Sequence, residues 1–151
     1  MPITDIADIT TAIKGQIITE LGVSYKELAY VEDVAKNSFR TSNNRYGVRA
    51  LVAGQLPGVT KFVTLNQEFE IILTKGYIQS SIDDTSQVTG SLDLRAELLS
   101  IYKRLINTKA GLPGTVLNIT DLILSSPEYL EDDKVVIQRA TMNIQYRYSL
   151  I

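Results

Sequence analysis

The chain has 151 residues, of which 44% are hydrophobic and 21% charged, and its net charge is −2. This composition is typical of one folded domain, expected over residues 1–151. The absence of cysteine and histidine excludes disulfides, thiolate metal sites and the commonest general base. The charge balance gives no basic field for nucleic acid or an anionic membrane. We therefore expect no enzyme, no cofactor, no metal and no sequence-specific binding of nucleic acid.

The N-terminal region and the apolar segments predict where the protein resides. No apolar run approaches the roughly 20 residues of a membrane helix. The N-terminus lacks the basic and then apolar pattern of a signal peptide. We expect a soluble, cytoplasmic protein that does not insert into a membrane.

Residues 3–22 predict an amphipathic helix, because apolar residues recur there every three or four positions. The apolar stripe consists of Ile6, Ile9, Ile13, Ile17 and Leu21. Thr4 or Asp5 can cap the start of this helix, and Gly22 stands where a left-handed C-cap residue is expected. The width of the stripe favours packing on a core over a partner-binding face.

The following segments predict strands separated by loops. Residues 25–34 are compatible with a short strand, and residues 36–45 are polar and predict a loop. Residues 46–53 predict a strand that ends at the glycine- and proline-containing turn 54–58. Over 61–74 apolar and polar residues alternate, which indicates a half-buried strand.

The middle of the chain predicts an arm and a second helix. Residues 75–90 are rich in Ser, Thr and Gly and predict either a mobile loop or an arm that reaches a neighbouring subunit. Residues 91–107 have the apolar spacing of a helix, with Ser91 as its N-cap. Its apolar positions are Leu94, Leu98, Ile101, Tyr102 and Leu105.

The end of the chain predicts two strands joined by an acidic loop. Residues 115–125 have a strand pattern that Ser126 and Pro127 end, and residues 128–133 are acidic. From 134 to 151 apolar and polar residues alternate over an unusual length, so this strand would span about 50 Å. The sequence therefore predicts an α+β domain: a mainly antiparallel β-sheet with two α-helices packed on one face and a long C-terminal β-hairpin.

Two acidic groups are candidate metal sites, and Asp83 with Asp84 is the weaker of them. Glu128, Glu131, Asp132 and Asp133 form the densest carboxylate group, and hard cations prefer oxygen ligands. Their spacing does not match a calcium-binding loop, which favours a solvated turn. A carboxylate-metal enzyme built on this group remains a distant alternative.

The second half of the chain runs from EFEIILT, through a helix ending in LLSIYKRLI, to the closing strand VVIQRATMNIQYRY. In these segments it resembles the tail terminator proteins of long-tailed bacteriophages. Similarity is closest over 120–125 and over 140–148, where the alternating strand ends on Tyr146, Arg147 and Tyr148. A different head-tail joining or tail-completion protein of the neck is the nearest alternative.

The resemblance implies a structural virion protein, assembled in the host cytoplasm and located in the tail or neck. Such a protein forms a hexameric ring that caps the head-proximal end of the tail tube, stops tube polymerisation and docks to the head connector. Its partners would be further copies of itself, the tail tube protein and the head-tail connector protein, and DNA would pass through the ring. From loop position alone, the candidate contact residues are Tyr77, Ile78, Asp83, Asp84, Tyr129, Glu131 and Asp132.

Overall fold

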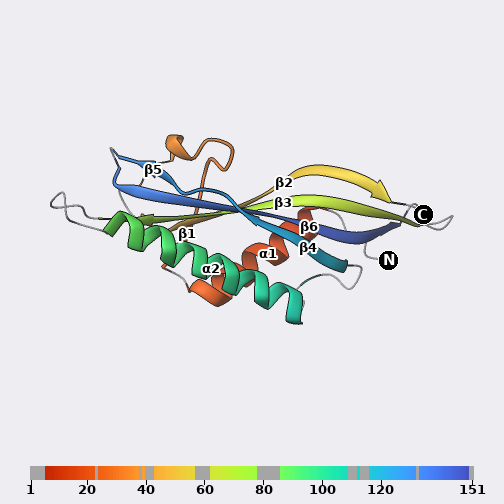
Figure 1. The fold of residues 1–151 in the computed structure, drawn as a ribbon. Helices are drawn as coiled ribbons and strands as arrows, with labels where there is room; N and C mark the ends of the chain where they lie inside the picture. Colours follow the sequence, from red (N-terminus) through yellow and green to blue (C-terminus); the bar gives the residue numbers. More distant parts are fainter. Residues whose placement is uncertain are drawn as a thin grey trace.

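Figure 1 presents a computed structural model of the chain, which describes residues 6–22, 24–37, 39, 43–56, 62–77, 86–108, 112, 116–131 and 133–149. In chain order the elements are α1 (Ile6–Leu21), β1 (Lys26–Glu27), the 3-10 helix η1 (Val34–Lys36), β2 (Arg45–Leu56), β3 (Phe62–Gly76), α2 (Ser86–Thr108), β4 (Val116–Leu124), β5 (Glu128–Leu130) and β6 (Val135–Ser149).

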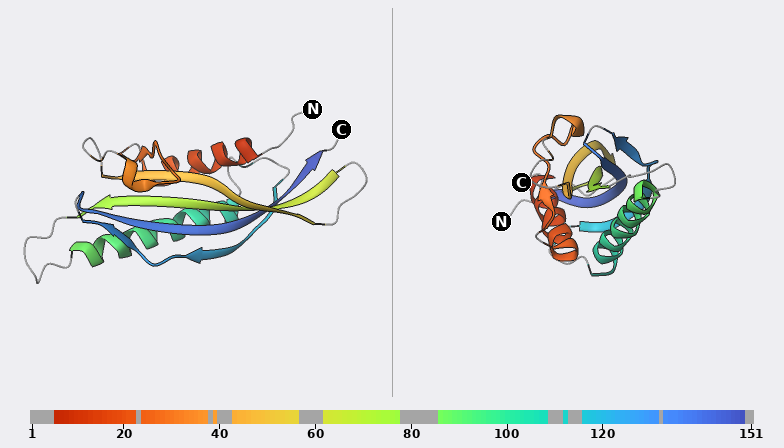
Figure 2. Two further views of the ribbon diagram at one scale, coloured as in Figure 1. Left: turned by 90° about the horizontal axis from the view of Figure 1, so that it is seen from above. Right: turned by 90° about the vertical axis from the view of Figure 1, so that its left-hand side faces the viewer.

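The strands form one sheet in the order β1-β2-β3-β6-β4, and β5 pairs with β6 beyond the end of β4. All pairs are antiparallel except the short pair of β1 with β2. At the centre, β3 and β6 pair along their whole length, from Phe62 with Ser149 to Gly76 with Val135. Both α-helices cover the same face of the sheet, α1 on the β2 side and α2 on the β4 side (Figures 1 and 2). The predicted α+β fold is confirmed, including the long C-terminal hairpin of β4 and β6.

The main core fills the space between the helices and the sheet. It includes the fully buried side chains of Ile13, Phe69, Leu98, Ile101 and Tyr146. Every second residue of β6 from Val136 to Tyr146 is buried on this side. The predicted stripes of both helices supply the other half of the core, with one correction: Ile6, predicted to belong to the α1 stripe, is 37% exposed because it lies at the start of the described helix. The alternating apolar side chains of β6 and the apolar side chains spaced three or four residues apart in the helices therefore pack together in one layer.

A second, smaller core lies on the other face of the sheet. There residues 28–37 and Phe39 cover one end of the strands, and the η1 turn lies above the sheet in Figure 1. The members of this second core are Leu28, Val34, Phe39, Ile72, Val135 and Ile137, with Val31 and Leu130 packed against them. Asn37 holds the segment in place, because its side chain bonds the backbone of Ala29, Tyr30 and Val34. Because this segment covers the outer face there, Val135 and Ile137, the first two residues of β6 on that face, are apolar.

Two glycines fit the helices into this arrangement. Gly22 has φ +89°, and its N–H donates to the Ile18 carbonyl at 2.8 Å, so it ends α1 in the predicted left-handed conformation. Gly90 lies in α2, where a Cβ would come within 3.2 Å of the Val136 side chain. The missing side chain lets α2 approach β6 closely.

The first half of the chain differs from the sequence prediction in two places. The strand predicted over 25–34 is reduced to Lys26–Glu27, because the following residues leave the sheet edge to cover its outer face. The turn predicted from Gly54 was placed too early, since β2 continues to Leu56. Gly54 pairs with Asn66 and Leu56 with Thr64, so the longer β3 supplies the hydrogen-bond partners that extend β2.

The second half differs in the linker and in the acidic loop. The segment predicted as a mobile loop or an arm over 75–90 contains the end of β3 and the start of α2, which begins at Ser86. Ser91 is therefore buried inside the helix and does not cap it. The predicted acidic loop at 128–133 begins with β5, in which Tyr129 pairs with Val136. The long β6 offers its edge there, and backbone pairing outweighs the acidic composition.

The position of Phe69 in the main core predicts a large loss of stability on truncation. Phe69 is 0% exposed, so Phe69→Ala should lower the free energy of unfolding by about 3–5 kcal/mol through lost apolar contact and a residual cavity. The matched control is Ile123→Ala, because Ile123 is 64% exposed and its truncation should change stability by less than about 0.5 kcal/mol. Urea unfolding measures both, and equal effects would contradict this description of the core.

Candidate assembly surfaces

Tyr77 and Tyr129, from the two segments predicted to contact partners, meet at one end of the sheet. The N–H of Tyr77, directly after β3, donates to the Lys134 carbonyl in the turn before β6 at 2.9 Å. The rings of Tyr77 and Tyr129 meet edge-on, with centroids 6.2 Å apart and planes at 85°. The fold thus brings together two predicted contact residues that are far apart in the sequence.

Exposure distinguishes the predicted contact residues at this end. Tyr77 is only 5% exposed, so its ring supports the surface from beneath. Tyr129 is half-buried, and Glu131 is exposed in the turn. Ile78, Asp83, Asp84 and Asp132 lie outside the described residues. The role of these seven residues as partner contacts stays a prediction.

Four charged residues cross the outer face of the sheet, one from each of four strands. Glu70 on β3 accepts from Arg49 on β2 at 2.8 Å and from Arg139 on β6 at 3.2 Å. Arg139 also donates to Glu128 on β5 at 2.9 Å. We call Arg49, Glu70, Arg139 and Glu128 the charged row. The Glu70 side chain is only 9% exposed, and two arginines compensate its loss of hydration.

Beyond the charged row the outer face is polar. Side chains that share this face with Glu70 along the paired strands are half-buried: Thr64, Asn66, Glu68, Thr141, Asn143 and Gln145. At the β4 edge, Asn143 donates to Asp121 at 3.1 Å. Asp121 has φ +61° and lies in an irregularity of the β4–β6 ladder between Thr120 and Ile123. At the β4 edge this half of the face also has the exposed side chain of Ile123, which pairs with Thr141.

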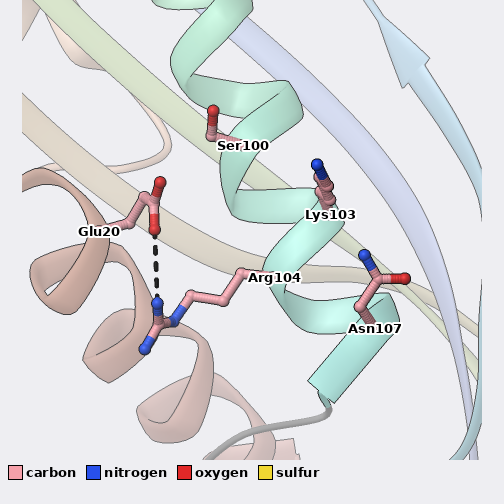
Figure 3. Close-up of a pocket in the computed structure, with 5 residues that line it drawn as sticks. All are labelled: Glu20, Ser100, Lys103, Arg104 and Asn107. Carbon is pink, nitrogen blue, oxygen red and sulfur yellow. Dashed lines mark ion pairs between the residues drawn. The ribbon is translucent and has the colours of Figure 1, made fainter.

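A shallow hollow of about 340 Å³ lies where the C-terminal halves of α1 and α2 meet (Figure 3). Glu20 contributes from α1, and Ser100, Lys103, Arg104 and Asn107 contribute from α2. Arg104 joins the two helices, because it pairs with Glu20 at 3.5 Å and donates to Gln16 at 2.6 Å. The hollow is lined by polar and charged residues, and the sequence analysis did not single it out.

The outward side of α2 carries exposed apolar residues that sequence reasoning also missed. Leu92, Leu99 and Ile106 are 59%, 50% and 39% exposed, although they belong to a helix packed on the core. We call these three residues the α2 row. The sequence signal for the α2 row is its spacing of seven residues, which indicates a second apolar line along the helix, outside the buried stripe.

Tyr25 connects the segment after α1 to α2. Its hydroxyl donates to Glu97 at 2.6 Å, and its side chain is buried. Burial, and after it the hydrogen bond and charge of Glu97, raise the pKa of Tyr25 far above its ordinary value. Burial also raises the pKa of Tyr46. Tyr25 is therefore neutral in the folded state at the pH where free tyrosine ionises.

The carboxylate group weighed as a metal site is divided by the fold. Glu128 lies in β5 and is engaged by Arg139, whereas Glu131 and Asp133 are exposed in the turn. Among the described residues, no group of three or more Asp and Glu side chains is arranged to hold a metal ion. Within the same residues, no helix is long and apolar enough to cross a membrane.

Comparisons with known proteins give a likeness of fold. No protein-family model matches the chain, and no curated protein matches it. Among solved structures, it matches a chain in a structure described as the virion of a native gene transfer agent particle. That match covers 95% of this chain and 96% of the other, with a TM-score of 0.50 and 10% sequence identity. The shared property is the fold.

The charged row predicts a stability loss when its central charge is removed. Glu70→Gln leaves Arg49 and Arg139 without their shared carboxylate at a nearly buried position, so the free energy of unfolding should fall by about 3 kcal/mol. Glu68→Gln is the control, because Glu68 is half-buried two residues away and should tolerate the change within about 0.5 kcal/mol. Urea unfolding of both variants tests this, and a neutral Glu70→Gln would contradict it.

The environment of Tyr25 predicts a loss of stability at alkaline pH. Free tyrosine ionises near pH 10, but the folded chain holds Tyr25 neutral, so the unfolded state releases the proton first. The free energy of unfolding should therefore fall as the pH rises above about 10. Tyr25→Phe should lower stability by about 1 kcal/mol at pH 7 and should make the alkaline decline shallower. Urea midpoints from pH 7 to 11 measure both effects, and parallel pH profiles would contradict the assignment.

Proposed function

We propose that this chain is a structural subunit of a phage-like virion, and that it acts as the tail terminator. The observation that supports a virion role is the fold, which matches a chain of a gene transfer agent virion over nearly the full length of both. The sequence resemblance to terminators of long-tailed phages supports the more specific role. In this role six copies form a ring that caps the head-proximal end of the tail tube.

The arrangement of the domain suits a ring. Its two flanks differ, since α1 and β2 lie on one side and α2 and β4 on the other (Figure 2). Contacts between unlike flanks are heterologous, and a heterologous contact that closes by rotation forms a ring. The ends of the long strands then face along the tail axis. We assign the end around Tyr129 and Glu131 to a partner, either the tube protein or the connector.

A tube-length experiment tests this proposal. The tail tube subunit encoded beside this chain is polymerised with and without the protein, and the tubes are imaged by electron microscopy. We expect tubes of fixed length, with a six-fold density at one end, only when the protein is present. The control is the same reaction with Phe69→Ala, which lacks the packing of the main core.

The outcomes separate the roles. Tubes that lengthen without limit and have bare ends would overturn the terminator assignment. Binding of the chain to the isolated head connector, together with bare tubes, would instead favour another head-tail joining or tail-completion protein of the neck. The proposal of a virion subunit fails if the chain binds neither the tube nor the connector.

A further inference from the structure

The segment that covers the outer face of the sheet is hydrogen-bonded mainly to itself. We call residues 28–37 together with Phe39 the strap (Figure 1). The Asn37 side chain makes four hydrogen bonds with the strap backbone, at 2.8 to 3.0 Å. Within the part of the chain that the structure describes, residues 29–37 form hydrogen bonds only with one another. The shape of the strap therefore does not depend on polar contacts with the sheet.

Apolar side chains make the contact between the strap and the sheet. The buried residues in this contact are Leu28, Val34 and Phe39 from the strap and Ile72, Val135 and Ile137 from β3 and β6. Among the described residues, one hydrogen bond joins the strap to a strand, from the N–H of Leu28 to the Tyr46 carbonyl at 2.8 Å. β2, β3 and β6 bond to one another beneath the strap. Lifting the strap would therefore break this one bond and leave the sheet intact.

The apolar patch under the strap adjoins the end of the sheet that we assign to a partner. Val135 pairs with Leu130 on β5, and Leu130 packs against the same small core. Leu130 lies between Tyr129 and Glu131, which belong to that end. Lifting the strap would thus add apolar surface directly beside the end surface. While the strap is closed, the free subunit does not expose this surface to unwanted association.

We infer that the strap lifts as one piece during assembly and exposes Ile72, Val135 and Ile137 to the tail tube subunit. This inference rests on the proposed function, in which the terminator must bind at a tube end and must not associate beforehand. The closed strap blocks the apolar patch in the free chain. At the tube end, an apolar surface of the tube subunit takes the place of the strap, and its burial offsets the lost contacts.

A disulfide between the strap and β2 tests whether lifting is required. A Cβ at Gly47 would lie 3.3 Å from Cγ1 of Val31, so Val31→Cys combined with Gly47→Cys brings two sulfur atoms within bonding reach. The chain has no cysteine of its own, so this pair alone is oxidised. We expect the oxidised double variant to cap growing tubes about tenfold less often than the same protein after reduction. The reduced form should cap tubes as the unchanged chain does.

A second disulfide controls for the effect of cross-linking itself. Glu68→Cys combined with Asn143→Cys joins paired positions of β3 and β6 and leaves the strap free. Its oxidised and reduced forms should cap tubes equally. Equal capping by the oxidised and reduced forms of the strap variant would overturn the inference and leave the terminator role standing. Bare tubes with the unchanged chain would instead overturn the proposed function.

Amide hydrogen exchange tests the lifting in the free chain, without tubes. When the strap lifts as one piece, the Leu28 N–H loses its acceptor on β2, whereas the N–H groups of Ala29 and Tyr30 keep theirs on Asn37. Corrected for intrinsic rates, the Leu28 amide should exchange about tenfold faster than the other two. Asn37→Ala should remove this difference. Equal protection of the three amides in the unchanged chain would overturn the inference, whatever the tubes show.

Discussion

The burial of β6 against β3 is the constraint on which the rest of the molecule depends. The two strands pair along their full length at the centre of the sheet, and β6 is covered on both sides over its first residues. The apolar positions facing the helices fix where α1 and α2 lie, and Val135 and Ile137 on the other side fix the path of residues 28–39. The candidate assembly surfaces, namely the sheet end at Tyr129, the charged row, the hollow between the helices and the α2 row, are the edges and outer sides that this packing does not bury.

The two faces of the sheet consequently have different roles. On the face that the helices cover, the apolar core is continuous from Ile9 in α1 through Phe69 to Leu105 in α2. On the other face, buried apolar side chains lie only under Phe39 and its neighbours, and polar side chains follow from the charged row onwards. A domain of this kind has its rigidity in the centre and its distinct surfaces at the periphery, which suits a subunit that must contact several different neighbours.

The sequence predicted the parts of the fold whose signal is local and periodic. The stripe of α1 from Ile9 to Leu21, the C-cap at Gly22 and the alternation of β6 appear where expected, because each depends on residues close in the chain. The parts of the fold that the sequence did not predict depend on pairing between strands that are far apart in the chain. β5 forms because β6 passes beside it, and β2 extends past Gly54 because β3 is longer. The exposed α2 row was missed for a related reason, since a buried and an exposed leucine are alike in sequence until the neighbours are placed.

The charged row has a consequence for how the chain finds its native pairing. Arg139 and Glu70 are on the outer face, whereas their chain neighbours Gln138, Ala140, Phe69 and Ile71 are on the inner one. A slip of one residue between β3 and β6 would turn a strand over and carry a charge into the apolar layer beneath the helices. A slip of two residues that set Arg139 opposite Thr74 would keep the faces but separate Arg139 from Glu70. The charged row therefore adds a penalty to that misalignment of two long strands, which their alternating pattern alone would tolerate.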